Sequence, residues 1–155
     1  MSTQSLIDVV SDAGAQWHSY RDELSIPYAF GDVRAEYSVL SQRAGLHYSG
    51  HWGRLAFTGS DHIDFLHRMT TNHFLDLGDR FGLQAVFTEQ RGRIVDWATF
   101  YHRNLQTLAI VSPAAHMKVR DWLDRFLFTE EVTISDLTAD TCLLYTSDAA
   151  DDLIG

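Results

Sequence analysis

The stretch that decides the fold is Gly92-Arg93-Ile94-Val95-Asp96-Trp97-Ala98-Thr99-Phe100-Tyr101. Its strand-like part, residues 94–101, is separated from a second strand-like run at 81–88 by a polar, glycine-containing link. Two such runs joined by a short link predict a β-hairpin. A third run, at 107–111, follows after a short turn. Three consecutive strands with short connections favour antiparallel pairing.

Helical patterns interrupt these strands rather than alternating with them. Apolar residues recur at spacings of four, three and four within 33–44, which predicts an amphipathic helix, and Gly45 follows as its stop signal. We therefore expect an α+β fold, not a doubly wound α/β fold. The pattern also predicts strands at 54–58 and 132–134, a helix opening at 6–10, a break at Pro27, a helix capped by Ser60, and a helix starting at Ser112-Pro113 whose buried side holds Met117, Trp122, Leu123, Phe126 and Leu127.

The end of the chain differs from the rest. The run Cys142-Leu143-Leu144-Tyr145-Thr146-Ser147-Asp148-Ala149-Ala150-Asp151 resembles a translated sequencing-library adapter. We expect residues 142–155 to be a disordered artefact and residues 1–141 to be one part-domain. The tail holds three acids and no base, so the formal net charge of −9 becomes −6 for residues 1–141. Its Cys142 is the only cysteine, so residues 1–141 offer no thiol nucleophile and no thiolate metal site.

Composition also limits the classes of partner. Residues 1–15 lack the basic start and unbroken apolar core of a signal peptide, and no run approaches the roughly 18 apolar residues of a membrane span. We expect a soluble, cytoplasmic protein with no membrane partner. A net charge of −6 predicts no direct nucleic-acid partner. The eight histidines show no metal-ligand spacing, so no metal site is expected.

Asp96 is the first candidate for chemistry. It follows Ile94-Val95, where an apolar run meets an acid. A half-buried carboxylate at such a place is a useful proton acceptor. The alternative is an acid on the solvent face of a hairpin.

Four segments stand out by their order and spacing: Arg43-Ala44-Gly45-Leu46, Gly53-Arg54-Leu55-Ala56-Phe57-Thr58-Gly59, Asp64-Phe65-Leu66-His67-Arg68-Met69-Thr70-Thr71-Asn72 and Gly92-Arg93-Ile94-Val95-Asp96. Together they resemble the folate-binding domain of the aminomethyltransferase superfamily. That superfamily includes the T-protein of the glycine cleavage system and the folate-dependent proteins that support iron–sulfur enzymes and tRNA modification. The resemblance implies a tetrahydrofolate cofactor, and a chain that covers only the N-terminal part of the family's folate domain.

The resemblance also shows an altered site. The family has two adjacent aspartates where this chain has Asp96 and Trp97, and the second is the one thought to act on folate. Tryptophan accepts no proton but stacks well on a flat pterin ring. Asp96 remains the candidate catalytic acid, because a one-residue bulge would return it to the face that Trp97 otherwise occupies. The folate-binding residues implied by the resemblance are His51, Trp52, Asn72, Gln84, Trp97, Tyr101 and Ser112.

Two arginines, Arg91 and Arg93, flank Gly92 at the expected hairpin tip. They are candidates to meet the glutamate tail of a folate or a phosphate, and the alternative is a solvated tip.

Three functions stay open at this point. The first is a folate-binding protein that supports iron–sulfur enzymes or tRNA modification without aminomethyl transfer. The second is a tetrahydrofolate-dependent aminomethyltransferase, which would act with a lipoyl carrier protein and use Asp96 as its acid. The third is a fragment that binds nothing. The altered positions, among them Trp52, Gln84 and Trp97, favour the first.

Overall fold

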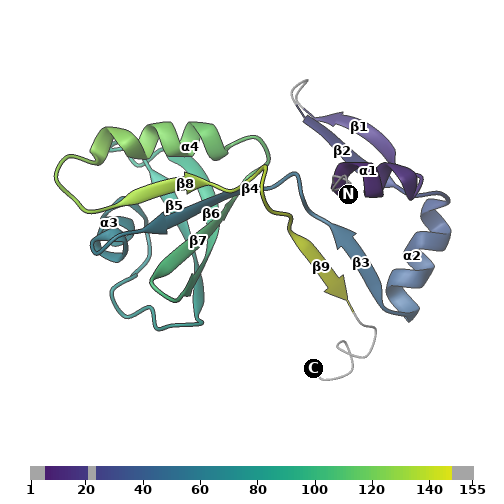
Figure 1. Cartoon of the computed structure of the whole chain (residues 1–155), viewed down its shortest axis with the longest axis horizontal. Helices are drawn as coiled ribbons and strands as arrows, with labels where there is room; N and C mark the ends of the chain where they lie inside the picture. Colours follow the sequence, from purple (N-terminus) through teal and green to yellow (C-terminus); the bar gives the residue numbers. More distant parts are fainter. Residues whose placement is uncertain (1–5, 21–23, 148–155) are drawn as a thin grey trace, which may run out of the picture. The chain divides into compact units, whose positions relative to one another are not determined.

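The computed structural model describes residues 6–20 and 24–147 (Figure 1). These residues form two compact units, one comprising the chain up to His51 together with the chain from Cys142, the other comprising Trp52–Thr141. The sequence predicts one part-domain over residues 1–141 instead. Periodicity identifies helices and strands, but it does not say which of them share a core.

The first unit contains two short helices and two separate two-stranded sheets. Helix α1 (Leu6–Asp12) confirms the expected helix opening, and α2 (Val33–Gln42) confirms the amphipathic helix. Asp32 caps α2, because its side chain accepts a hydrogen bond from the Arg34 N–H at 3.0 Å. The expected break at Pro27 is wrong: strands β1 (Gln16–Tyr20) and β2 (Leu24–Ala29) form a two-stranded antiparallel sheet in which Pro27 pairs with Trp17. Such a sheet has only edge strands, and edge strands accept proline.

The expectation of disorder from Cys142 onward does not hold for Leu144–Ser147. This segment forms strand β9, which pairs antiparallel with β3 (Gly45–Tyr48). A lone strand such as β3 presents unpaired backbone groups, and Leu144-Tyr145-Thr146 has the composition that pairs readily with such an edge. Residues 148–155 lie outside the described residues, and the adapter origin of the tail stays a prediction.

The second unit is a five-stranded antiparallel sheet in the order β5-β6-β7-β4-β8, which confirms the α+β fold and the antiparallel pairing. Two α-helices and a 3₁₀ helix complete it. The strands are β4 (Gly53–Thr58), β5 (Gly82–Thr88), β6 (Ile94–Arg103), β7 (Gln106–Val111) and β8 (Thr133–Asp136), and the helices are α3 (His62–Met69), α4 (His116–Leu123) and the 3₁₀ helix η1 (Asp124–Phe126).

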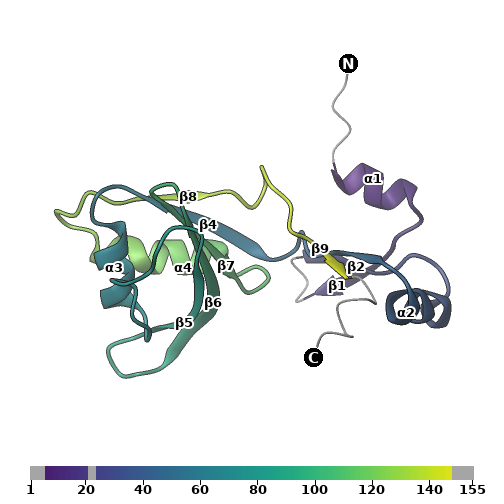
Figure 2. The same ribbon diagram turned by 90° about the horizontal axis from the view of Figure 1, so that it is seen from below.

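Helices α3 and α4 cover one side of this sheet (Figure 2). The core lies between them and the strands. Its largest fully buried side chains are phenylalanines and leucines from both layers: Phe57, Phe65, Phe74, Phe87, Phe100, Leu55, Leu66 and Leu123.

Both helices of this unit begin later than predicted. Ser60 is not the cap of α3; the cap position is Asp61, and Ser60 Oγ bonds Asp61 and Glu131 instead. Gly59 makes the preceding turn at φ +106°, where a Cβ would lie 1.9 Å from the Glu131 carbonyl oxygen.

Helix α4 begins at His116 rather than at Ser112-Pro113. Ala114 has a φ of +60°, and the Ala115 N–H donates to the Ser112 carbonyl at 3.0 Å, so a turn separates proline from helix. The expected buried side is confirmed at Leu123 and is wrong at Met117, which is 44% exposed. Trp122, Phe126 and Leu127 are half-buried against the core.

Candidate functional site

Strand β6 carries the candidate site, and its alternation divides the candidates between two faces. Asp96, Ala98 and Phe100 are buried on the helix-covered face. The intervening Trp97 and Tyr101 are 47% and 54% exposed on the other face. Neighbouring strand residues point to opposite sides of a sheet, so Asp96 and Trp97 lie on different surfaces.

A bulge is present in this hairpin, but Asp96 remains on the covered face. Thr88 pairs with Ile94 and Phe87 pairs with Asp96, which leaves Val95 as the extra residue. Asp96 Oδ2 then accepts the backbone N–H of Ser112 at 2.9 Å. This carboxylate therefore ties β6 to the turn after β7. Asp96 and Ser112 are brought together by a backbone contact that the sequence does not reveal.

The open face of the hairpin gathers three of the predicted residues. Gln84 of β5 lies in register with Thr99, and Val86 with Trp97. Gly82 lies opposite Tyr101, where an added Cβ would stand 3.0 Å from Tyr101 Cδ1 and 2.6 Å from the Phe100 carbonyl oxygen. A bare backbone at this position makes room for the tyrosine ring. Gln84, Trp97 and Tyr101 thus form one polar and aromatic surface, which we call the open face.

Asn72 is placed at the edge of this surface. Its Nδ2 donates to the Gln84 carbonyl at 2.8 Å, and its Oδ1 accepts the His73 N–H at 2.7 Å. The preceding Thr71 also bonds β5, through its N–H to the Val86 carbonyl and through its Oγ1 from the Val86 N–H. The side chain of Asn72 therefore positions the segment after α3 against β5.

Trp52 and His51 lie at the boundary between the two units. His51 closes the first part of unit 1, and Trp52 opens unit 2. The Trp52 carbonyl accepts from the guanidinium of Arg54, which also donates to the Thr138 carbonyl and, at 2.8 Å, to the Thr141 carbonyl. Arg54 is 3% exposed. Sequence reasoning missed this buried arginine, whose only signal is a charge at the start of an apolar strand.

A pocket of about 440 Å³ adjoins Tyr101 at the end of the hairpin away from its tip. Its lining adds two cations and an exposed aromatic ring to the predicted residues. The residues are Arg80, Phe81, Tyr101, His102 and Arg103. Sequence reasoning missed this pocket. Its residues come from the start of β5 and the end of β6, which are distant in the chain and become neighbours only when the two strands pair.

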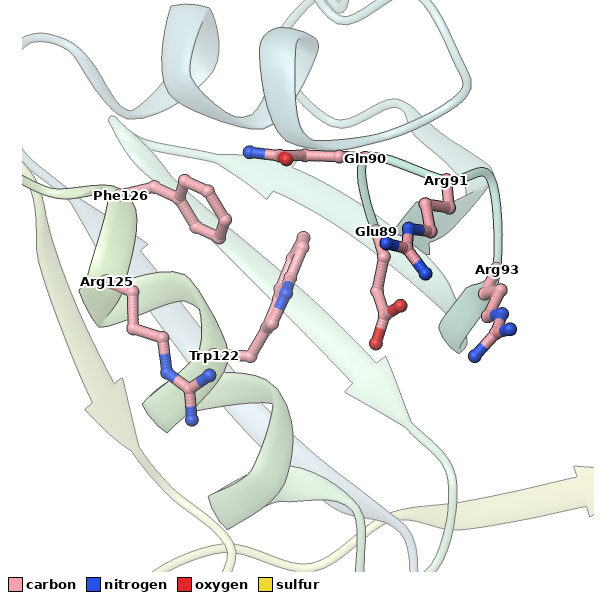
Figure 3. Close-up of a pocket in the computed structure, with 7 residues that line it drawn as sticks. All are labelled: Glu89, Gln90, Arg91, Arg93, Trp122, Arg125 and Phe126. Carbon is pink, nitrogen blue, oxygen red and sulfur yellow. The ribbon is translucent and has the colours of Figure 1, made fainter.

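Arg91 and Arg93 occupy the hairpin tip as expected, but they line a different pocket, with Trp122 and Phe126, on the helix side (Figure 3). They are therefore separated from Tyr101 by the length of the hairpin.

Two acids on the helix-covered side have lowered pKa values. The backbone N–H of Phe128 and then the Arg68 guanidinium lower the pKa of Glu130 to about 2. For Asp136 burial acts to raise the pKa, but hydrogen bonds from Thr138 and the charges of His116 and Arg120 outweigh it, so the pKa is lowered. Both acids stay ionised at neutral pH. Within residues 6–20 and 24–147, no three His, Cys, Asp or Glu side chains gather into a metal-binding group.

Comparison with known proteins places this fold in a family. The model of the GCVT N-terminal domain matches residues 6–146. The aminomethyltransferase of Shouchella clausii is 26% identical over 140 residues, which cover 90% of this chain and 38% of that protein. A chloroplast protein of Arabidopsis thaliana named as a transferase is 33% identical over 94 residues, covering 60% and 22%. The chain therefore belongs to the GCVT N-terminal domain family, within the aminomethyltransferase superfamily.

A solved structure agrees in fold. Aminomethyltransferase T of the glycine cleavage system from Bartonella henselae superposes with a TM-score of 0.83 at 18% identity, covering 96% of this chain and 41% of that one. The chain spans about a third of the length of the curated aminomethyltransferases it matches, as in the 32% covered for Rubrobacter xylanophilus. In the part of the chain that the structure describes, no helix is long and apolar enough to cross a membrane.

Proposed function

We propose that this chain binds tetrahydrofolate, or a folate derivative, on the open face of the β5–β6 hairpin. We further propose that it serves iron–sulfur enzymes or tRNA modification in the cytoplasm, without transferring aminomethyl groups. Membership of the GCVT N-terminal domain family supports the folate ligand. The observation that carries the proposal is the pair Trp97 and Tyr101, two aromatic rings about half exposed on a single strand face.

The chemistry of the open face suits a pterin. A large aromatic side chain stacks favourably on a planar ring, and exposed Trp97 supplies that surface. The exposed amide of Gln84 offers both donors and an acceptor for the ring edge. Arg80 and Arg103, in the pocket beside Tyr101, are candidates to receive the carboxylates of the glutamate tail. This replaces the expectation that Arg91 and Arg93 would do so.

The position of Asp96 argues against aminomethyl transfer. A general acid or base must lie within hydrogen-bond reach of the proton it moves. Asp96 is 9% exposed and holds the Ser112 N–H on the helix-covered face, whereas the residue facing outward at the family's second aspartate is Trp97. The open face of this hairpin thus presents an aromatic ring in place of the carboxylate.

Binding is tested by titrating the chain with 5-formyltetrahydrofolate, followed by calorimetry and by tryptophan fluorescence. We expect saturable binding that weakens about tenfold or more in Trp97→Ala, since one aromatic stacking contact is worth about 1–3 kcal/mol. Trp97→Phe keeps a stacking surface and should retain most of the affinity. Trp17→Ala, which removes a tryptophan from strand β1, is the matched control and should bind as the parent does.

Equal affinity of Trp97→Ala and the parent would overturn the stacking role. If the parent shows no saturable binding, the third hypothesis, a fragment that binds nothing, would replace this proposal.

An aminomethyltransferase remains the second candidate, because the bacterial relatives carry that name and Asp96 is one residue from the expected acid. It predicts tetrahydrofolate-dependent release of ammonia from an aminomethyl-lipoyl carrier protein. Turnover that is present in the parent and abolished in Asp96→Asn, at unchanged folate affinity, would replace the first proposal with this one.

A further inference from the structure

A second pocket lies on the helix-covered side of the hairpin, at the tip. It measures about 310 Å³, near the lower end of the range of about 300–1,000 Å³ for small-molecule sites. One wall is the loop that joins β5 to β6, and the other is the end of α4 with η1 (Figure 3). The loop is fixed by the Glu89 N–H donating to the Arg93 carbonyl at 2.9 Å and the Gly92 N–H donating to the Glu89 carbonyl at 2.8 Å.

Three guanidinium groups gather around this pocket. Arg91 and Arg93 stand on the loop side, and Arg125 stands on the helix side, with Trp122 between them (Figure 3). By contrast, Arg68, Arg80 and Arg120 of unit 2 each form an ion pair. Within the described residues, no ion pair is found for the three pocket arginines. Glu89 is the one acid among the lining residues, so the three guanidinium groups leave the pocket with a net positive charge, which favours an anion.

Trp122 supplies a rigid aromatic wall. Its ring packs edge-on against Phe87, with centroids 6.1 Å apart, and against Phe126, with centroids 5.2 Å apart. The ring is half-buried, so these contacts fix its orientation while part of it lines the pocket. A ring held in place loses little freedom when a planar ligand stacks on it.

Glu89 distinguishes between classes of anion. It also lines the pocket, and its side chain lies between Trp122 and the two loop arginines (Figure 3). An ionised carboxylate only accepts hydrogen bonds, so it repels a bare anion and attracts hydroxyl and amino groups. A ligand that suits all three features has a phosphate at one end, hydroxyl or amino donors, and a planar ring.

We propose that this pocket binds a nucleoside phosphate. Guanidinium groups match the geometry of phosphate oxygens bidentately, and stacking of a base on tryptophan needs no particular base. Glu89 accepts from the sugar hydroxyls or the exocyclic amine. The site is separate from the open face, because it lies on the other side of the hairpin.

The test is calorimetric titration of the whole chain with AMP, with inorganic phosphate, and with adenosine. We expect AMP to bind at least about tenfold more tightly than phosphate, since phosphate lacks the stacking ring. The double variant Arg93→Gln with Arg125→Gln should weaken AMP binding by about 30-fold or more, because charged hydrogen bonds are lost on both sides of the pocket. The control is Arg34→Gln with Arg43→Gln, two exposed arginines of unit 1 and the same change in charge, which should bind AMP as the parent does.

Each other outcome overturns the proposal. Equal affinities for AMP and phosphate would leave an anion site without a nucleoside. Equal weakening in both double variants would mean diffuse attraction to the whole chain, and no saturable AMP binding at millimolar concentration would mean no site.

Saturating 5-formyltetrahydrofolate should leave the AMP affinity unchanged, whereas competition between the two would overturn a separate pocket. AMP binding without folate binding would defeat the proposed function and leave this inference standing.

Discussion

The two faces of strand β6 differ although they share one backbone. The covered face carries Phe100, which is fully buried against Phe74 and Phe87 at centroid distances of 4.9 and 5.6 Å. The open face carries Tyr101, which is 54% exposed. Adjacent residues of β6 therefore have different roles: Phe100 packs in the core, and Tyr101 is exposed to solvent. The same step separates Asp96, which holds a neighbouring turn, from Trp97, which faces outward.

The largest effect is expected on the covered face. Phe100→Ala removes a ring at the centre of an aromatic cluster and should lower the free energy of unfolding by about 3–5 kcal/mol. The adjacent Tyr101→Ala should cost about 1 kcal/mol or less, because an exposed side chain leaves no cavity. Urea unfolding measures both. Similar losses in the two variants would break the contrast between the faces.

Asp96 tests whether a candidate acid has a structural role. Asp96→Ala leaves the Ser112 N–H without its acceptor and should cost about 1–3 kcal/mol. Asp96→Asn keeps an oxygen in place and should cost less. Folate affinity should be the same in both variants as in the parent. Reduced affinity at unchanged stability would place Asp96 in the ligand site and contradict the division into faces.

Gly82 pairs with Tyr101 across the hairpin and lies close to both the Tyr101 ring and the Phe100 carbonyl. Gly82→Ala pushes a Cβ toward the Phe100 carbonyl and should cost about 1–2 kcal/mol. It should also move the Tyr101 ring and weaken folate binding. Gly31→Ala is the matched control, since a Cβ there meets nothing within 4 Å. A neutral Gly82→Ala would mean that Tyr101 does not need the bare backbone.

The smallest effect is expected at Glu130, in the loop that precedes β8. Glu130 accepts the Arg68 Nη2 at 2.9 Å, and its folded pKa of about 2 lies below its ordinary value of 4.5. A depressed pKa stabilises the fold above pH 4.5, and the contribution is lost as the pH falls toward 2. Glu130→Gln should therefore lower Tm slightly at pH 7, and the gap to the parent should close across that interval. Asp140→Asn, at an exposed acid, is the matched control for the loss of one negative charge.

Local pattern predicted the elements of unit 2 well. The strand-like runs at 81–88 and 94–101 and the polar link between them predicted the β5–β6 hairpin, and the sequence pattern also predicted β4, β7 and α3. Local pattern failed for short strands, whose structure depends on the strand with which they pair. Strands β1, β2 and β3 were missed, and β9 was assigned to a disordered tail, because isolated strands of four to six residues show little periodicity of their own.

The family resemblance identified some of the candidate residues, but only the fold showed which face of the sheet each of them occupies. The sequence by itself predicted the family resemblance, the α+β class and the candidate residues Asp96 and Trp97. Tertiary structure alone decided that Val95 bulges, that Asp96 bonds the backbone of Ser112, and that Gln84 joins Trp97 and Tyr101 on the open face. It also brought Arg125 to Arg91 and Arg93 around Trp122. The physical reason is that side-chain direction in a strand depends on register, and register is set by pairing between segments distant in the chain.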